Sequence, residues 1–382
     1  MESELSGKEE LYAEEVQEEA RELLCALGRI PAPSCHEEER AQFVKDWLED
    51  QGAEGLYIDE AKNVIYPYFC AGATEITVFM AHLDVVFPDT EELPLRCQGG
   101  RIYAPGIGDD TANLVNLLLA ARYVIKEELK PKRGRGVLFV ADSGEEGLGN
   151  LKGCKAVMRQ YGPRVKEFVS FDCYLGRCID QAVGSHRYKV TVRTEGGHSY
   201  ANFGNQSAIA CLAAMVQELY AKEPPKKAKT TYNVGVIQGG STINSIAEEA
   251  SMLYEFRSLD QECLAEMEEY FQGLAAAWQR RGLKIEVETI GLRPCGGSPD
   301  REKLAALTAR HCAILKRYYG GRIVVEAGST DANIPLSLGI PANTVGTVAG
   351  GGAHTRGEWI ETASLLPGLK VALTCVLAAF QR

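Results

Sequence analysis

The sequence predicts an α/β protein with a mostly parallel sheet flanked by helices, into which a ferredoxin-like α+β domain is inserted. Three observations support this prediction. Short apolar runs alternate with helical stretches in the first and last parts of the chain, the middle has the order β-α-β-β-α-β, and 382 residues exceed one ordinary core. We expect residues 1–184 and 293–382 to form the host domain and residues 185–292 the insertion.

The first part of the chain alternates helices and strands. Ser34 and Glu37 have the spacing of a capping box, which predicts a helix that opens there and runs to about Gln51. The other elements show the periodicity of amphipathic helices or the short apolar runs of buried strands. They are the helices Glu14–Leu27 and Thr111–Leu129 and the strands Ile76–Ala81, Val137–Ala141 and Phe168–Phe171. Strands separated by helices imply a parallel sheet that is covered on both faces.

The pattern changes at His186, where the predicted insertion begins. Its expected elements are the strands His186–Thr194, Thr231–Gln238, Ala250–Arg257 and Lys284–Ile290 and the helices Asn205–Tyr220 and Gln261–Arg280. The last part of the chain returns to the first pattern, with the helices Arg301–Tyr319 and Ala363–Ala379 and the strand Arg322–Glu326.

Composition limits the classes of function. The chain carries 41 Lys and Arg against 52 Asp and Glu, a net charge of −11. This disfavours nucleic acid as a partner, because phosphate binding needs clustered basic side chains. We find no apolar run long enough to span a bilayer and no secretory signal in the acidic stretch Met1–Glu19, so we expect no membrane association. The 12 scattered cysteines favour free thiols in a reducing compartment, and we expect a cytoplasmic protein.

Acidic residues and histidines cluster where the predicted strands end. Because the carboxyl ends of parallel strands line one edge of a sheet, we expect several such side chains to meet there. The candidates are His82, Asp109, Glu145 or Glu146, Asp172 and His354. Two imidazoles with three carboxylates suit zinc, with manganese or cobalt as alternatives. Two ions about 3.5–4 Å apart, bridged by one carboxylate, would use all five ligands, although a single ion is also compatible.

Two further acids have expected roles beside the ligands. Asp84 stands two residues after His82, so its carboxylate can accept the second ring N–H of that histidine and orient it. Gly144 and Gly147 allow a turn that aims both Glu145 and Glu146 into the cleft. One of them would then bind metal, and the other would act as general base for a water molecule whose pKa the metal lowers.

The ordered motifs resemble those of the di-zinc metallopeptidase family that holds peptidase T, carboxypeptidase G, aminoacylase and succinyl-diaminopimelate desuccinylase. The resemblance extends from about Leu23 to Phe380, and the peptidase T branch is the most similar. The segments that carry it are His82-Leu83-Asp84, Gly108-Asp109-Asp110, Ser143-Gly144-Glu145-Glu146-Gly147, Asp172, Gly196-Gly197-His198-Ser199 and Gly352-Ala353-His354. The family's fold has a zinc-exopeptidase catalytic domain with an inserted lid and dimerisation domain, which agrees with the predicted insertion.

The resemblance implies a role for each site residue. His82 and Asp172 would hold one metal ion, Glu146 and His354 the other, and Asp109 would bridge them. Glu145 would be the general base and Asp84 the orienting residue. In the lid, His198 would stabilise the oxyanion, within one subunit or across a dimer interface. Asn244, Arg257 and Asp331 would bind substrate, Arg257 by pairing with a substrate carboxylate. Thr111 departs from the family, because many members have lysine at this place.

These features indicate an exopeptidase that hydrolyses an amide bond in small peptides and acts as a homodimer. An N-acyl-amino-acid deacylase would use the same catalytic residues, so the sequence leaves that reading open. A non-catalytic binding protein on the same scaffold is the third reading. The complete set of ligands and the presence of Glu145 argue against it.

Overall fold

The computed structural model describes residues 4–381, which fold into two compact units. Unit 1 comprises Met1–Ala182 and Gly297–Arg382, and unit 2 comprises Val183–Gly296. The insertion expected at residues 185–292 lies within unit 2.

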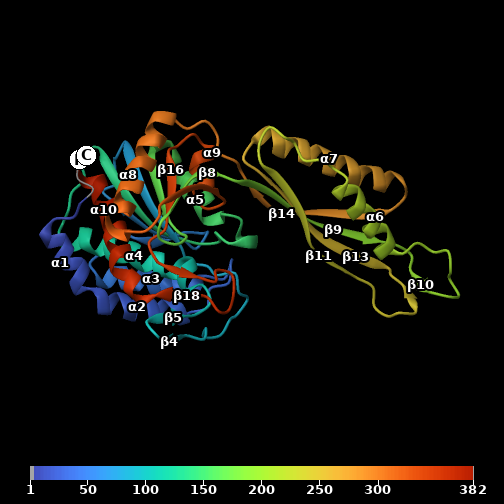
Figure 1. Ribbon diagram of the computed structural model, residues 1–382, viewed down its shortest axis with the longest axis horizontal. Helices are drawn as coiled ribbons and strands as arrows, with labels where there is room; N and C mark the ends of the chain where they lie inside the picture. Colours follow the sequence, from blue (N-terminus) through green and yellow to red (C-terminus); the bar gives the residue numbers. More distant parts are fainter. Residues whose placement is uncertain (1–3, 382) are drawn as a thin grey trace. The chain divides into compact units, whose positions relative to one another are not determined.

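An eight-stranded sheet forms the centre of unit 1, in the order β1-β2-β6-β3-β7-β16-β8-β15 (Figure 1). The strands are β1 (Tyr57–Ile58), β2 (Val64–Tyr68), β3 (Glu75–His82), β6 (Arg135–Asp142), β7 (Val165–Phe171), β8 (Arg177–Ala182), β15 (Val324–Gly328) and β16 (Ala342–Val345). The run β6-β3-β7-β16 and the pair β8-β15 are parallel, whereas β1-β2, β2-β6 and β8-β16 are antiparallel. The prediction of a mostly parallel sheet is therefore confirmed.

Side chains of the central strands alternate between two hydrophobic cores, one on each face of the sheet. In β3, Phe79 and Ala81 belong to one core, and Val78 and Met80 belong to the other. Successive side chains of a strand point to opposite faces, so a strand buried on both sides is apolar throughout. Helices α2 (Gln17–Arg29), α3 (Glu38–Asp50), α4 (Ala112–Lys126) and α10 (Leu365–Gln381) contribute to the first core, and α5 (Lys152–Tyr161) and α9 (Asn333–Ser337) to the second.

Two sequence predictions about the first helices are wrong. The single helix expected at Glu14–Leu27 is interrupted at Val16, between α1 (Gly7–Glu15) and α2. The capping box does not form, because α3 begins at Glu38 and its first turn has no side-chain cap. The Ser34 hydroxyl donates instead to Asp84 Oδ2 at 2.6 Å. Spacing alone could not show that a distant acid competes for this hydroxyl.

Unit 2 has the predicted β-α-β-β-α-β order. Its elements are β9 (Gly184–Arg193), α6 (Ala208–Tyr220), β11 (Thr230–Gly239), β13 (Glu249–Ser258), α7 (Gln261–Arg280) and β14 (Lys284–Arg293). They form an antiparallel sheet in the order β11-β13-β9-β14, which is the ferredoxin-like arrangement. A separate core built around Phe256 and Phe271 fills this unit. The sequence did not predict the short ribbon of β10 (Gly197–His198) and β12 (Ser245–Ile246).

A small sheet in unit 1 supports one of the loops that matter for function. Its order is β17-β18-β5-β4, from β4 (Arg96–Gln98), β5 (Arg101–Tyr103), β17 (Gly350–Gly351) and β18 (Trp359–Glu361). The loop between β17 and β18 carries His354, so antiparallel pairing fixes both ends of that loop. Helix α8 (Arg301–Tyr319) precedes β15 and completes unit 1.

The expectation that no apolar stretch is long enough to span a bilayer is wrong, because one helix has the required length and apolar composition. Thr362–Phe380 has a mean hydropathy of 1.8 and is long enough, but 61% of it is buried inside the fold. A core helix of a globular domain has these properties.

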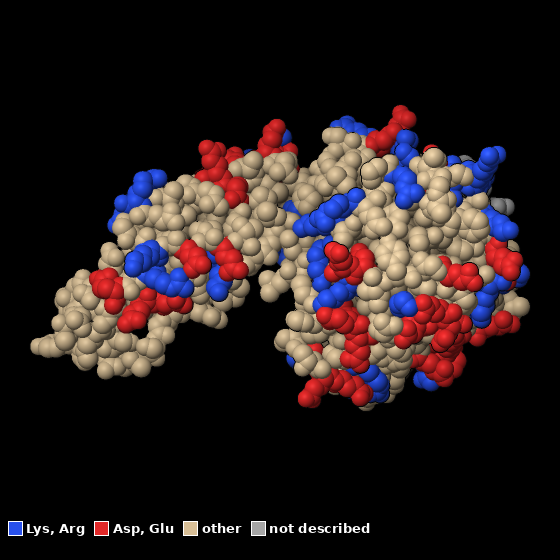
Figure 2. All heavy atoms as spheres, turned by 180° about the vertical axis from the view of Figure 1, so that it is seen from behind, with Lys and Arg blue, Asp and Glu red and all other residues tan. Residues whose placement is uncertain are grey.

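On the face shown in Figure 2, Lys and Arg side chains lie interspersed with Asp and Glu.

Candidate metal centre

The carboxyl edge of the central sheet brings together side chains that are far apart in the sequence. His82 ends β3 and lies opposite Asp142, the last residue of β6. Asp172 directly follows β7, which is the other neighbour of β3. Asp109 lies in the turn η1 (Ile107–Thr111) that leads into α4, and His354 follows β17. Parallel register therefore places His82 and Asp172 at one edge, and two loops add Asp109 and His354.

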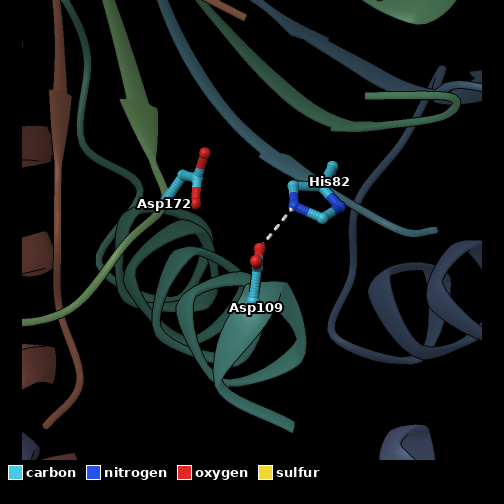
Figure 3. Close-up of side chains that lie close together, drawn as sticks. All are labelled: His82, Asp109 and Asp172. Carbon is cyan, nitrogen blue, oxygen red and sulfur yellow. Dashed lines mark hydrogen bonds and ion pairs between the residues drawn. The ribbon is translucent and has the colours of Figure 1, made fainter. Parts of the chain in front are cut away.

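Asp109 lies between two histidines, His82 and His354. Its Oδ1 is 3.1 Å from His82 Nε2, a contact drawn in Figure 3. Its Oδ2 is 3.2 Å from His354 Nε2. His354 Nε2 is also 3.2 Å from Glu146 Oε1. Each oxygen of one carboxylate thus faces an imidazole from a different segment, which is the arrangement of a bridging ligand.

Among residues 4–381, three overlapping groups of side chains could hold a metal ion. In each group the ligand atoms lie within 4.8 Å of one another. The groups are His82, Asp109 and Asp172; His82, Glu145 and Glu146; and Asp109, Glu146 and His354. The first and the third share Asp109. The first contains His82 and Asp172, the third contains Glu146 and His354, and the second joins His82 to Glu146.

The charges of this cluster fit divalent cations. Burial raises the pKa of Asp172 to about 7 and that of Glu146 to about 8, so the protein alone compensates their charges poorly. Hydrogen bonds to Asp109 and Glu146 raise the pKa of His354 to about 11. Without a cation, Asp109 and Glu146 stabilise the protonated form of the His354 imidazole. Metal binding requires the deprotonated form of this ring. A metal ion would replace that proton and neutralise the buried carboxylates.

The turn after β6 places both glutamates toward the cluster. Gly144 has a φ of +67°, a conformation that a side chain rarely adopts, and it starts the turn. The carboxylate of Asp84 holds the turn, since the N–H of Glu145 donates to Oδ1 at 3.0 Å and that of Glu146 to Oδ2 at 3.1 Å. Glu145 and Glu146 are buried and share one group with His82. In the turn that Gly144 opens, both glutamates therefore have a carboxylate oxygen near His82.

Asp84 orients His82 in a different way from the one predicted. The Nδ1 atom of His82 is 3.0 Å from the main-chain oxygen of Asp84 and 3.5 Å from its carboxylate. The carboxylate is occupied mainly by the Glu145–Glu146 turn and by Ser34. The backbone of Asp84 therefore fixes the ring of His82, and its side chain fixes the turn that carries the expected base.

Comparison with known proteins places this geometry in a family. The profile of peptidase family M20/M25/M40 matches residues 78–378, which include every side chain of the cluster.

The chain belongs to peptidase family M20/M25/M40.

Relatives of this M20 chain match over nearly its whole length. Protein YqjE of Bacillus subtilis (strain 168), itself uncharacterised, is 25% identical over 373 residues, 92% of this chain and 95% of YqjE. The crystal structure of aminopeptidase PepT from Bacillus cereus ATCC 10987 has a TM-score of 0.69 at 22% identity and covers 96% of this chain and 99% of its own. A tripeptidase from Staphylococcus aureus subsp. aureus Mu50 has a TM-score of 0.72 at 20% identity, with coverage of 96% and 99%. The chain is a metallohydrolase of the M20 family with the family's fold.

The lid residues that the sequence singled out lie in unit 2. Pairing of β10 with β12 brings His198 and Asn244 together, because the Ser199 N–H donates to the Asn244 carbonyl at 3.0 Å. Both line an open hollow of about 470 Å³. Arg257 lies on β13, where both ends of its guanidinium donate to the Glu255 carboxylate at 3.0 Å. A substrate carboxylate would have to displace Glu255 from this arginine.

Asp331 lies beneath the cluster, where it is 1% exposed. Burial, followed by the charge of Asp142, raises its pKa well above the usual value. Asp331 and Asp142 are thus two buried carboxyl groups, and the charge of Asp142 disfavours ionisation of Asp331. This burial is at odds with direct contact between Asp331 and a substrate.

Four polar residues near the cluster were missed by the sequence reading. Ser34 contacts Asp84, and the Asp110 carboxylate accepts the backbone N–H of His82 at 2.9 Å. The Asn113 side chain donates to the carbonyls of Gly108 at 3.2 Å and Cys173 at 3.0 Å, beside two expected ligands. Glu358 binds the loop that precedes Asp109. Asp110 had a sequence signal in the Asp-Asp pair, whereas the others had none that separates them from ordinary loop and helix residues.

Thr111 occupies the place where many family members have lysine. Its hydroxyl donates to the Gly106 carbonyl at 2.6 Å. A cation is nonetheless close, because the buried guanidinium of Arg40 lies 3.4 Å from the Thr111 hydroxyl and donates to the Leu83 carbonyl at 2.8 Å. Positive charge next to His82-Leu83-Asp84 thus comes from α3.

Proposed function

We propose that this M20 chain is an exopeptidase that hydrolyses an amide bond in short peptides at a centre of two divalent ions. The observation that carries the proposal is Asp109, whose oxygens lie 3.1 Å from His82 Nε2 and 3.2 Å from His354 Nε2. His82 and Asp172 would hold one ion, and Glu146 and His354 the other. Zinc is the first candidate for this nitrogen and oxygen ligand set, with manganese or cobalt as alternatives.

Glu145 is the proposed general base. Divalent ions held by the five ligands would polarise a substrate carbonyl and would lower the pKa of a nearby water toward about 7. Glu145 lies beside His82 and Glu146, and the Asp84 carboxylate holds its backbone. From this position its carboxylate can take the proton of the attacking water and return it to the leaving nitrogen. The low exposure of Glu145, 5%, shields these transfers from bulk water.

His198 is the proposed oxyanion donor. Its Nδ1 atom accepts the backbone N–H groups of Tyr200 at 3.2 Å and Ala201 at 3.3 Å. A neutral ring that accepts at Nδ1 carries its proton on Nε2, which leaves Nε2–H free to donate to a developing negative charge. We propose that this donor acts on the metal centre of its own or of a partner subunit in a homodimer, and that Asn244 binds substrate in the same hollow.

The proposed substrates are short peptides with a free terminus. The solved relatives with this fold include an aminopeptidase and a tripeptidase, which makes dipeptides and tripeptides the first compounds to test. N-acyl amino acids present the same amide carbonyl and form the competing class. All twelve cysteines are free thiols, which supports our proposal that the enzyme works in the reducing cytoplasm.

A substrate screen with matched variants tests the proposal. Metal-free protein is loaded with zinc, manganese or cobalt and assayed against dipeptides, tripeptides, the same peptides with blocked termini and N-acyl amino acids. We expect turnover of free peptides, and a loss of roughly 10²- to 10⁴-fold in Glu145→Gln with its metal content unchanged. Glu91→Gln, at an exposed loop position, is the matched control and should retain full activity.

Two results would overturn parts of this proposal. Full turnover by Glu145→Gln would remove Glu145 as the base. Turnover of N-acyl amino acids without turnover of peptides would replace the exopeptidase with a deacylase and leave the metal centre unchanged.

A further inference from the structure

Glu358 is a buried acid close to the metal centre that belongs to none of its ligand groups. It stands four residues after His354 and directly before β18. Its side chain is 0% exposed, and charged groups are rarely buried so completely unless they have strong partners. The partners of Glu358 therefore indicate what it does.

The Glu358 carboxylate accepts hydrogen bonds from the loop that carries Asp109. Oε2 accepts the N–H of Gly106 at 2.8 Å, and Oε1 accepts the N–H of Gly108 at 3.0 Å. Oε1 also accepts the N–H of Asp109 itself at 2.8 Å. The Tyr174 hydroxyl donates to the same oxygen at 3.3 Å. Three backbone N–H groups within four residues of the chain thus donate to one carboxylate. Hydrogen bonds to a charged acceptor are stronger than those between neutral groups.

The glycines of this loop make that approach possible. A Cβ atom on Gly108 would stand 3.1 Å from Glu358 Oε1 and 2.8 Å from the Tyr174 ring. A Cβ atom on Gly106 would stand 2.2 Å from the Val85 side chain, and Gly106 also has a φ of +70°. The segment Gly106-Ile107-Gly108 is therefore shaped to receive a carboxylate from another part of the same unit.

The loop is held from its other side as well. The Asn113 side chain donates to the Gly108 carbonyl at 3.2 Å, while Glu358 accepts the Gly108 N–H. Buried side chains thus fix both the N–H and the carbonyl of Gly108. Asp109 follows directly, so the direction of its side chain depends on these contacts.

The position of Asp109 decides whether both halves of the centre can form. Its Oδ1 faces His82, and its Oδ2 faces His354. Rotation of the loop would move both oxygens at once. Glu358 belongs to the same loop as His354. This one loop therefore supplies the ligand His354 and also holds the backbone of Asp109, the proposed bridging ligand.

We propose that Glu358 is a positioning residue that locks the bridging carboxylate of Asp109 and links it to the His354 loop, so that the two metal ions bind as one unit. This inference rests on the proposed two-metal centre. Glu358 contacts neither ion nor substrate in this proposal. It acts by fixing Asp109, whose carboxylate would be a ligand of both ions.

The test is metal binding by the full-length protein, measured without any substrate. Metal-free protein is titrated with Zn²⁺ against a chromophoric chelator, and with Co²⁺ while its visible absorption spectrum reports ligand geometry. We expect Glu358→Gln to bind ions roughly 10- to 100-fold more weakly than the wild type, the range for residues that orient metal ligands. The Co²⁺ spectrum should change as well, because the amide turns an N–H donor toward backbone donors. Glu358→Asp keeps the charge and should recover part of the affinity.

Two further variants control this experiment. Glu361→Gln changes an exposed acid on β18 of the same small sheet and should bind metal like the wild type. Gly108→Ala disturbs the same contact between Gly108 and Glu358 by a change in the loop instead of the acid. It should also weaken metal binding. It serves as the second test if Glu358→Gln does not fold, which circular dichroism and thermal unfolding will show.

The outcomes separate this inference from the proposed function. If the wild type binds no divalent ion, the metal centre itself fails. If the wild type binds two ions and both Glu358→Gln and Gly108→Ala bind them equally tightly, Glu358 is not a positioning residue, whatever happens to activity.

Discussion

The two units place their charged groups in opposite ways. Unit 1 buries acids and histidines at the end of its central sheet, among them His82, Asp84, Glu146 and Asp172. In the described part of unit 2, Arg293 is the one charged side chain that is buried, and the candidate residue His198 lies on the surface. Buried charge costs stability unless it is paired, whereas an exposed histidine costs almost nothing. Unit 1 should therefore depend on bound cations for its stability, and unit 2 should not.

Metal removal is the largest test of this comparison. Chelation should abolish peptidase activity and lower the stability of unit 1, by about 4 kcal/mol if the free ion had been present at about 1,000 times its Kd. Hydrogen exchange read by mass spectrometry can follow the two units separately. We expect loss of protection in β3, β6 and β7 and unchanged protection in β9 and β13. Equal losses in both units would contradict the comparison.

Replacement of His198 tests the same contrast from unit 2. His198→Ala should lower turnover roughly 10²- to 10³-fold, because one oxyanion donor is lost, without a change in the unfolding temperature. Steady-state kinetics and thermal unfolding of the same preparation measure both quantities. His198→Gln keeps an N–H donor and should recover part of the rate. A large drop in unfolding temperature would show that His198 is structural.

Acid pH gives the smallest expected effect within unit 2, where it acts through Glu268. Burial works against ionisation of Glu268, but hydrogen bonds from His186, Tyr188 and Gln272 outweigh it and lower its pKa below the usual 4.5. A lowered pKa in the folded state means that stability is fully present above 4.5 and is lost as the pH falls through the lower, folded value. Unfolding temperatures between pH 6 and pH 3 should fall less steeply in Glu268→Gln than in the wild type. Parallel curves would remove Glu268 as a source of acid sensitivity.

Much of the fold follows from local pattern. Helices α7 and α8 have the predicted bounds, and strands β3, β6 and β7 extend the predicted runs by a few residues. Long periodic helices and apolar runs are the strongest local signals. Strands β8 and β16 were missed, since Arg177–Ala182 carries charges and Ala342–Val345 has only four residues. Their strand conformation depends on sheet neighbours rather than on their own sequence.

Prediction of the site followed a similar division. Two of the five expected ligands, His82 and Asp172, stand at the ends of neighbouring parallel strands, so parallel topology brings them to one edge. The other three lie in loops that reach the same edge. The sequence did not reveal that Asp84 holds the Glu145–Glu146 turn, that Asp331 is buried, or that Arg257 is paired with Glu255. These facts depend on which side chains meet after folding, and spacing along the chain does not encode such meetings.

By itself the sequence determined the order of helices and strands, the inserted ferredoxin-like unit and the residue types that metal chemistry requires. These features depend on local periodicity and on the chemistry of single side chains. Only the tertiary structure decided that the oxygens of Asp109 face two different imidazoles and that Glu358 holds the loop behind them. Angstrom-scale distances between distant segments arise from the register of the sheet and from the packing of its loops. No stretch of the chain carries that information alone.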